Sequence, residues 1–232
     1  MKNTLITFAA VAVAAVALPT AAQAELSANL ALTSKYKFRG QDQSDPGDSV
    51  LPAVQGGFDW EGAGFYAGNW NSSIGFGGGT EMDFYGGWRG DAAGLAVDVG
   101  ALQYHYPGDT DLNTTELYAS VGWGPLTAKY SHTVSSRWFG VADGRGSGYF
   151  EVNGSMDLAG GIALAAHVGT TRFASKARKA GDVADYTDIK LGASIELGHG
   201  FAAEAAWVGA DKKRFWGDVN DGHVVLTLSK SL

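Results

Sequence analysis

From residue 26 to the C-terminus, apolar and polar side chains alternate residue by residue over a series of segments. In the segment 188–197 the apolar positions are Ile189, Leu191, Ala193, Ile195 and Leu197, and smaller or charged residues fill the positions between them. A period of two places successive side chains on opposite faces of an extended strand. The chain is therefore predicted to form β-strands that have one apolar and one polar face.

About twelve such segments can be counted, with uncertain edges. They are 26–40, 50–60, 64–73, 80–90, 94–106, 113–123, 125–136, 147–158, 161–173, 185–197, 200–210 and 221–232. Short turns join some neighbours, at 61–63, 91–93, 124–125, 159–160 and 198–199, and they alternate with longer connections at 41–49, 74–79, 107–112, 137–146, 174–184 and 211–220. An up-and-down sheet places alternate connections at opposite ends, so one end carries tight turns and the other carries long loops.

We therefore predict an all-β fold, a transmembrane up-and-down antiparallel β-barrel of about 12 strands. A soluble barrel or a ligand-binding β-sandwich would show the same period with the apolar face buried. The segments are longer than most globular strands and suit a tilted crossing of a bilayer. Aromatic residues near each strand end resemble interfacial girdles. The tight-turn band is Trp60, Phe65, Trp88, Trp123 and Phe201, and the long-loop band is Tyr36, Phe38, Trp70, Tyr104 and Tyr106.

The first 24 residues have a different character. Lys2 precedes an apolar run from Leu5 to Leu18, and the sequence Ala22-Gln23-Ala24 follows. This pattern is typical of a cleaved signal peptide. We expect residues 1–24 to be removed and residues 25–232 to form one outer-membrane β-barrel domain.

Composition excludes several classes of protein. The 232 residues include no Cys, so thiolate metal sites and Cys nucleophiles are excluded. The net charge is −7, which argues against a nucleic-acid partner. A mean hydropathy of −0.06 excludes a bundle of membrane-spanning helices.

Strand parity assigns most charged residues of the segments to the interior of the barrel. The basic residues Lys35, Lys37 and Arg39 share one face of segment 26–40, near the long-loop mouth. The other inward candidates are Asp59, Glu81, Asp83, Asp98, Glu116, Lys129, Glu151, Asp188, Lys190 and Glu204. In a water-filled lumen these charges would set ion selectivity, and in a packed lumen they would form a paired plug. Both interpretations fit the sequence.

No catalytic, cofactor or metal site is predicted. Of the His residues considered for a hydrolase, only His167 clearly faces inward, and no motif supplies a nucleophile for it. A lumen histidine bonded to a neighbouring carboxylate explains it better than catalysis does. The segments 109–111 and 218–222 lack the spacing of a calcium loop.

The long loops carry a basic excess. It consists of Arg137, Arg145, Arg172, Lys176, Arg178, Lys179, Lys212, Lys213 and Arg214. If these loops are extracellular, they could pair with phosphates of lipopolysaccharide in the outer membrane. The alternative is that the loop charges are solvated.

Short blocks along the whole mature chain resemble one known family. They are SANLALTS (27–34), YKFRG (36–40), QGGFD (55–59), GFYAG (64–68), EMDFYGG (81–87), TELYA (115–119), GPLTAKYS (124–131), DYTD (185–188) and LSKSL (228–232). Their order resembles the TorF-type porins, a conserved exported family of Gram-negative bacteria. The chain departs from that pattern at Lys35, where an acidic residue is usual, and at Leu232, where Phe is usual. The resemblance implies an outer-membrane barrel and brings no ligand-binding residues.

We therefore expect a porin-like channel for passive diffusion of small hydrophilic solutes or ions, with no cofactor. The alternative is a closed, non-conducting outer-membrane barrel that has a structural or surface-interaction role.

Overall fold

The computed structural model describes residues 24–44 and 51–232. The predicted leader therefore lies outside the described residues, apart from Ala24. Within the two described ranges, no helix combines the length and the apolar character needed to cross a bilayer.

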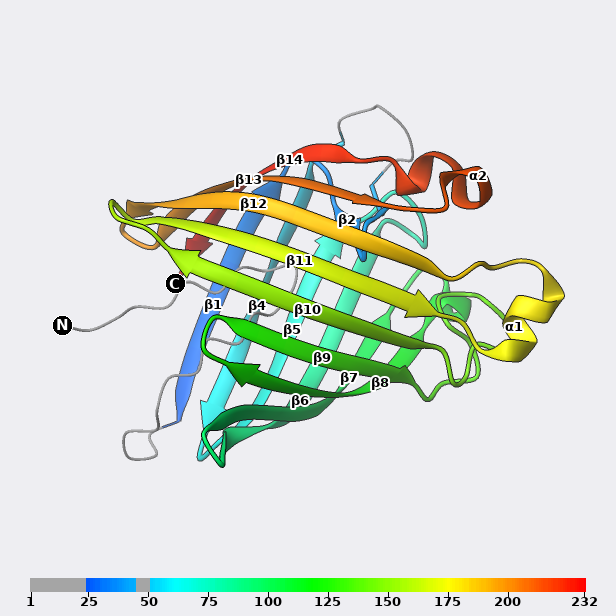
Figure 1. The fold of residues 1–232 in the computed structure, drawn as a ribbon, viewed down its shortest axis with the longest axis horizontal. Coiled ribbons are helices and arrows are strands. Elements are labelled where there is room, and N and C mark those ends of the chain that lie inside the picture. Colours follow the sequence, from blue (N-terminus) through cyan, green and yellow to red (C-terminus); the bar gives the residue numbers. More distant parts are fainter. Residues whose placement is uncertain (1–23, 45–50) are drawn as a thin grey trace.

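Twelve antiparallel strands form a closed barrel (Figure 1). They are β1 (Glu25–Thr33), β4 (Ala53–Gly62), β5 (Phe65–Ser73), β6 (Thr80–Ala92), β7 (Leu95–His105), β8 (Thr114–Trp123), β9 (Leu126–Thr133), β10 (Gly148–Asp157), β11 (Ile162–Arg172), β12 (Tyr186–Gly198), β13 (Phe201–Ala210) and β14 (His223–Ser231). Each strand pairs with the next along the chain, and β1 closes the barrel by pairing with β14 and β4. The predicted fold class and strand number are confirmed.

The two ends of the barrel differ as predicted. Tight turns join β4 to β5, β6 to β7 and β12 to β13, and the end of β14 lies on the same side (Figure 1). At Ala63-Gly64, Ala93-Gly94 and His199-Gly200 both residues have positive φ, the conformation of a two-residue type I′ turn. The opposite end carries the long loops, with the short helices α1 (Ser175–Ala180) and α2 (Lys213–Trp216) and the 3₁₀ turns η1 (Thr110–Leu112) and η2 (Gly217–Asn220).

The outer surface of the barrel is apolar. Leu26, Trp123 and Val224 are 65–73% exposed, and large apolar residues on every strand of the barrel are exposed in the same way. Such a surface is stable against hydrocarbon, where a closed sheet also satisfies all its backbone hydrogen bonds. The apolar face therefore points outward and the polar face lines the lumen, as a membrane-spanning barrel requires.

One of the two predicted aromatic girdles exists. Trp60, Phe65, Trp88, Trp123 and Phe201 of the tight-turn band are all exposed on the outer surface. The predicted long-loop band is wrong, because Tyr36, Tyr104 and Tyr106 are at most 4% exposed and form one interior cluster with Phe38 and Trp70 at its edge. Trp70 and Tyr104 are inward by strand parity, and Tyr36 and Phe38 are not on a wall strand.

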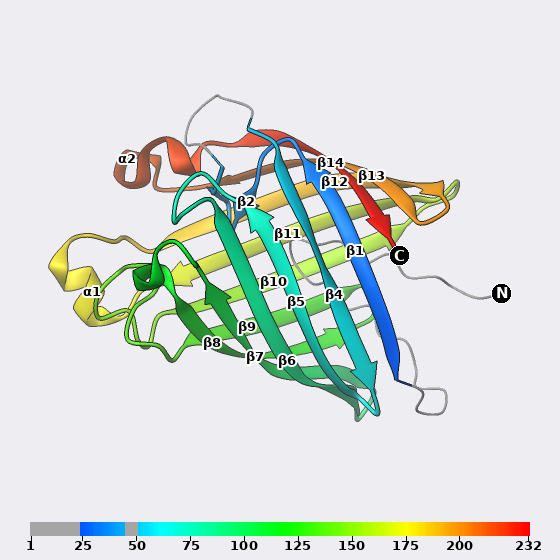
Figure 2. The same ribbon diagram turned by 180° about the vertical axis from the view of Figure 1, so that it is seen from behind.

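The first predicted strand is too long. β1 ends at Thr33, and residues 35–44 turn into the lumen as a separate hairpin of β2 (Lys37–Phe38) and β3 (Gln41–Asp42). Views from opposite sides both place β2 within the outline of the barrel (Figures 1 and 2). The long connection between β1 and β4 therefore spans 34–52 rather than 41–49, and we call its residues Lys35–Ser44 the lumen hairpin.

Candidate functional site: the lumen and its hairpin

The lumen hairpin reverses direction at Arg39-Gly40. Both residues have positive φ, at 47° and 76°, so the turn has the same conformation as the tight turns between the wall strands. Gly40 lies against β12, because a Cβ at this position would lie 2.5 Å from Cβ of Asp188 on that strand. The hairpin therefore enters the lumen from β1, and its tip contacts β12, the third strand from β1 around the barrel.

Arg39 fixes the hairpin tip to a second wall strand. Its Nη1 and Nη2 donate to Oε1 and Oε2 of Glu116 on β8, at 3.0 and 2.6 Å. The guanidinium also lies over the ring of Tyr149 on β10, 4.2 Å from its centroid. The planar fork of Arg matches a carboxylate and stacks on an aromatic ring, so this one residue anchors the tip to two strands.

The base of the hairpin is held by its own ion pairs and by the long loops. Lys35 and Lys37 lie 2.6 and 3.8 Å from Asp42, and the three side chains are almost fully buried. Lys37 Nζ donates to the carbonyl oxygen of Asp221 at 2.7 Å, and Gln41 Nε2 donates to Oδ1 of Asn220 at 2.8 Å. Burial lowers the pKa of Lys37 to about 8, although the charge of Asp42 opposes this shift.

A carboxylate on β6 holds the other side of the hairpin. Tyr36 OH donates to Oε1 of Glu81 at 2.7 Å, and Tyr106 OH donates to the second oxygen of the same carboxylate. Glu81 is 2% exposed. Asp83, two residues further along β6, is also buried.

A second polar network surrounds His167 on β11. Its Nε2 lies 2.7 Å from Oδ2 of Asp188, and its Nδ1 lies 2.7 Å from Oδ1 of Asn153. Glu151 lies 3.5 Å from Nδ1, and the hydroxyl of Tyr149 bonds both to His167 and to Asp188. The predicted pairing of His167 with a neighbouring carboxylate is confirmed, and all four of its polar neighbours are wall residues.

The remaining predicted lumen residues lie towards the tight-turn end. Asp59 accepts from Tyr85 OH at 2.5 Å, and Asp98 accepts from Tyr66 OH at 2.6 Å. Lys190 pairs with Glu204 at 2.6 Å. Lys129 lies over the ring of Tyr118, 4.2 Å from its centroid. These strand residues occupy the interior face, as strand parity predicted.

The three basic candidates do not form a charged wall. Lys35, Lys37 and Arg39 leave the barrel wall with the hairpin, and each lies against a carboxylate. At this level the contacts agree with the paired plug of the two interpretations, because oppositely charged groups in contact largely cancel their fields. Sequence reasoning missed their partner Asp42 and the tyrosines. Arg39-Gly40 carries the same signal as the other turns, a residue followed by Gly between short extended runs, and could have revealed the hairpin.

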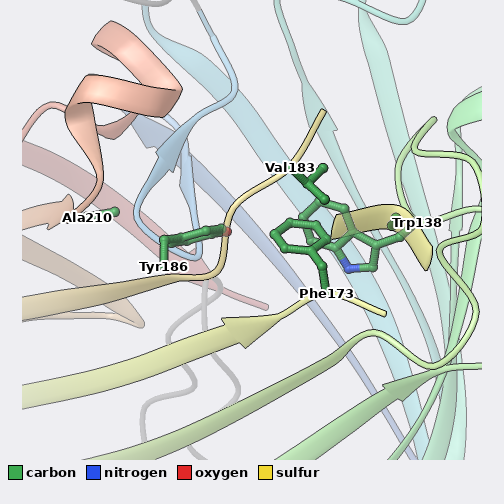
Figure 3. Packing of buried hydrophobic residues seen from close by; sticks show 6 residues of the cluster. Trp138, Phe173, Val183, Tyr186 and Ala210 are labelled. Carbon is green, nitrogen blue, oxygen red and sulfur yellow. The ribbon is translucent and has the colours of Figure 1, made fainter. Parts of the chain in front are cut away.

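The long loops form a cap over their end of the lumen. Trp138, Phe173, Val183, Tyr186 and Ala210 are buried in one cluster, in which Trp138 and Phe173 are in edge-to-face contact at 4.7 Å (Figure 3). Phe139 contacts both this cluster and the aromatic cluster around the lumen hairpin. Apolar side chains therefore connect the loops to the hairpin.

Several of the basic loop residues are paired within the loops. Arg172 and Arg178 both lie about 3 Å from Oδ2 of Asp185, and Lys213 lies 2.8 Å from Asp221. Arg137 and Lys176 lie within 4.0 Å of Asp111 and Asp143. Part of the predicted basic excess is therefore neutralised locally.

Lumen residues near the tight turns are accessible to solvent. Ser155 and Glu196 are exposed, and Asp98, Ser120 and Lys190 are partly exposed. At the level of the hairpin, by contrast, Thr114, Thr133 and Thr171 are completely buried. The lumen is thus an open vestibule at one end and a packed constriction at the other.

A family model described as "Bacterial protein of unknown function (Gcw_chp)" matches residues 17–231. The chain belongs to this family. No curated protein matches the Gcw_chp chain. The TorF-type name expected from the sequence is not part of that description and stays a proposal.

Solved structures resemble this Gcw_chp barrel in fold. One is described as "NanC porin structure in rhombohedral crystal form", with a TM-score of 0.52 and 9% identity, covering 88% of this chain and 98% of that one. Another comes from "Unveiling the Mechanism Behind the in-meso Crystallization of Membrane Proteins", with a TM-score of 0.56, 6% identity and coverage of 89% and 83%. At these identities the similarity concerns the fold alone.

Proposed function

We propose that the protein is an outer-membrane channel for passive diffusion of small hydrophilic solutes or ions, and that the lumen hairpin is its constriction. The supporting observation is the hairpin that crosses a polar lumen from β1 to Glu116 and Asp188. A polar lumen inside an apolar wall is the arrangement that lets hydrophilic solutes cross hydrocarbon. The proposed role is transport, without catalysis.

The proposed location rests on the barrel and on the predicted leader. A closed β-barrel that has an apolar exterior is the architecture of outer-membrane proteins. Because the number of strands is even, the end of β14 and the start of β1 both lie at the tight-turn end. In outer-membrane barrels the end with the short turns faces the periplasm. The open vestibule would then face the periplasm, and the hairpin would lie towards the cell exterior. A porin among the structures of similar fold agrees with this proposal.

A closed, non-conducting barrel is the second candidate function. The observation that favours it is the dense packing at the hairpin level, where Tyr36, Glu81 and Glu116 are at most 4% exposed. The hydrogen bonds of Arg39 to Glu116 and of Tyr36 to Glu81 also help to fix a single structure at this level. In this alternative the hairpin is a permanent plug, and the role of the protein lies at its loop surface.

Single-channel recording in a planar bilayer separates the two candidates. The mature protein is refolded, and folding is verified by heat-dependent gel mobility. We expect discrete conductance steps with a reproducible reversal potential in a salt gradient. A folded barrel that gives no steps would overturn the channel proposal in favour of the closed barrel.

The loop partner is a separate proposal. We propose that cations of the helical loops, among them Lys179 and Arg214, contact phosphates of lipopolysaccharide. Cationic side chains near an anionic membrane surface favour such contacts, and salt weakens them. Replacing both Lys179 and Arg214 by Gln removes two charges and should weaken the binding of the refolded protein to lipopolysaccharide. Unchanged binding in this double variant would contradict the proposal.

A further inference from the structure

Two buried polar atoms lack hydrogen-bond partners next to the lumen hairpin. They are Oδ1 of Asp83 and Nε1 of Trp70, and neither has a partner in the described part of the chain. Asp83 on β6 and Trp70 on β5 are directly opposite each other in the strand register, so they lie on the same face of the sheet. Buried polar groups are rarely left unbonded. Because Oδ1 of Asp83 is an acceptor, it marks a position for a hydrogen-bond donor that enters from the lumen, whereas Nε1–H of Trp70 is itself a donor and needs an acceptor.

The surrounding charge defines the sign of that molecule. Asp83 is 7% exposed, and the charged groups that act on it are the carboxylates Glu81 and Glu116. Arg39 neutralises Glu116 through two hydrogen bonds. Glu81 is bonded to the hydroxyls of Tyr36 and Tyr106, which carry no charge. A cation at Asp83 would relieve the repulsion among these carboxylates, since an unpaired buried carboxylate is costly.

Aromatic rings adjoin the same position. The ring of Tyr36 lies in edge-to-face contact with that of Trp70, with a centroid distance of 5.6 Å. Aromatic faces attract cations, and Trp is the strongest of them. A carboxylate beside such rings suits an ammonium group, which donates hydrogen bonds to the carboxylate and presents its charge to the rings.

Carboxylates also line the approach to this position from the tight-turn end. Asp59 and Asp98 line the vestibule, and their closest partners are the hydroxyls of Tyr85 and Tyr66. A tyrosine hydroxyl satisfies the hydrogen bonding of a carboxylate without cancelling its charge. Arg89 and Lys129, which lie over the rings of Tyr66 and Tyr118 at the same level, offset part of this charge, so Asp59 and Asp98 favour cations only in their own neighbourhood.

We propose that Asp83 binds positively charged solutes, with a primary ammonium group as the matching chemistry, and that the channel is cation-selective. The selectivity rests on the channel function proposed above. The binding does not, because it requires access to Asp83 from one end of the lumen and not passage through the barrel.

Binding is tested first, without any need for conduction. Methylammonium chloride is titrated into refolded protein at constant ionic strength, with sodium chloride as the balance, and tryptophan fluorescence is recorded. We expect a saturable change that disappears in Trp70→Phe. Asp83→Asn should weaken binding about tenfold, which corresponds to about 1.4 kcal/mol. Asp83→Glu keeps the charge and should retain most of the binding.

Asp91→Asn is the matched control, because it removes the same charge from the same strand. Asp91 is exposed and lies at the tight-turn end. It should bind methylammonium like the unchanged protein. The assignment would be overturned if the fluorescence of the unsubstituted protein shows no saturable response to methylammonium. It would also be overturned if Asp83→Asn binds methylammonium as tightly as the unsubstituted protein does. If Asp83→Asn does not fold, the titrations of the unsubstituted protein and of Trp70→Phe still show whether methylammonium binds beside Trp70.

Reversal potentials in a potassium chloride gradient test the selectivity. We expect preference for potassium over chloride, reduced in Asp83→Asn and kept in Asp91→Asn. Conductance with anion preference would overturn the inference while leaving the channel function intact. A silent barrel that binds methylammonium through Asp83 would overturn the channel function and leave the binding site standing.

Discussion

Arg39 at the tip of the lumen hairpin forms a two-point ion pair with Glu116 on β8, with its closest contact at 2.6 Å. Both side chains are at most 6% exposed. The pair joins a turn that follows the first strand to the opposite wall of the barrel. It therefore makes the position of the hairpin dependent on the complete closure of the sheet.

Arg39→Gln should destabilise the barrel by about 3 kcal/mol, because it leaves the Glu116 carboxylate buried without its cation. Glu116→Gln should have a comparable effect, and the double change should cost less than the sum of the two. Denaturant midpoints of the refolded protein in detergent provide the measurement. Additive single effects would show that the two residues are energetically independent.

Replacement of residues 35–44 by a flexible Gly-Ser linker should remove the constriction. Because wall pairing between β1 and β4 does not involve these residues, the barrel should still close. We expect a several-fold larger single-channel conductance, on the order expected for a pore that loses an internal obstruction. Equal conductance before and after replacement would mean that the hairpin does not limit the pore.

Gly40→Ala should displace the hairpin tip, for two reasons. The residue has φ +76°, and an added Cβ would lie 2.5 Å from Cβ of Asp188. Gly181→Ala is the control, since Gly181 has φ +88° and nothing within 4 Å of an added Cβ. The control should cost about 1 kcal/mol from backbone strain alone. Gly40→Ala should lower the free energy of unfolding by more than Gly181→Ala does, and it should change the conductance. Equal losses of stability in the two variants would argue against a tight contact at the hairpin tip.

Lys37 should make stability depend on pH in the alkaline range. Its pKa is lowered from 10.5 to about 8, so between these values the unfolded chain binds more protons than the folded protein. Stability from this group therefore rises with pH across that window. Denaturant midpoints at pH 7.5 and 10 should show this gain relative to Lys37→Met. If Lys37→Met gains the same amount of stability between pH 7.5 and 10, then groups other than Lys37 cause the pH dependence.

The sequence predicted the wall of the barrel closely but missed the plug. Segment 185–197 corresponds to β12 (Tyr186–Gly198), and segment 113–123 corresponds to β8 (Thr114–Trp123). Parity also placed His167 and Asp188 on the interior face. The prediction failed at residues 34–44, where polar and aromatic residues still alternate although the chain has left the wall.

The sequence by itself determined the strands, their inward and outward faces, and the two kinds of end. These follow from local rules, since alternation fixes the faces of a strand and Gly permits the turns with positive φ. Only the tertiary structure decided which lumen charges meet. The contact of Arg39 with Glu116 and the burial of Asp83 beside Trp70 join positions that are far apart along the chain or on separate strands, and closure of the barrel brings them together. Whether a lumen is wide or filled depends on such long-range contacts, which an alternating pattern does not encode.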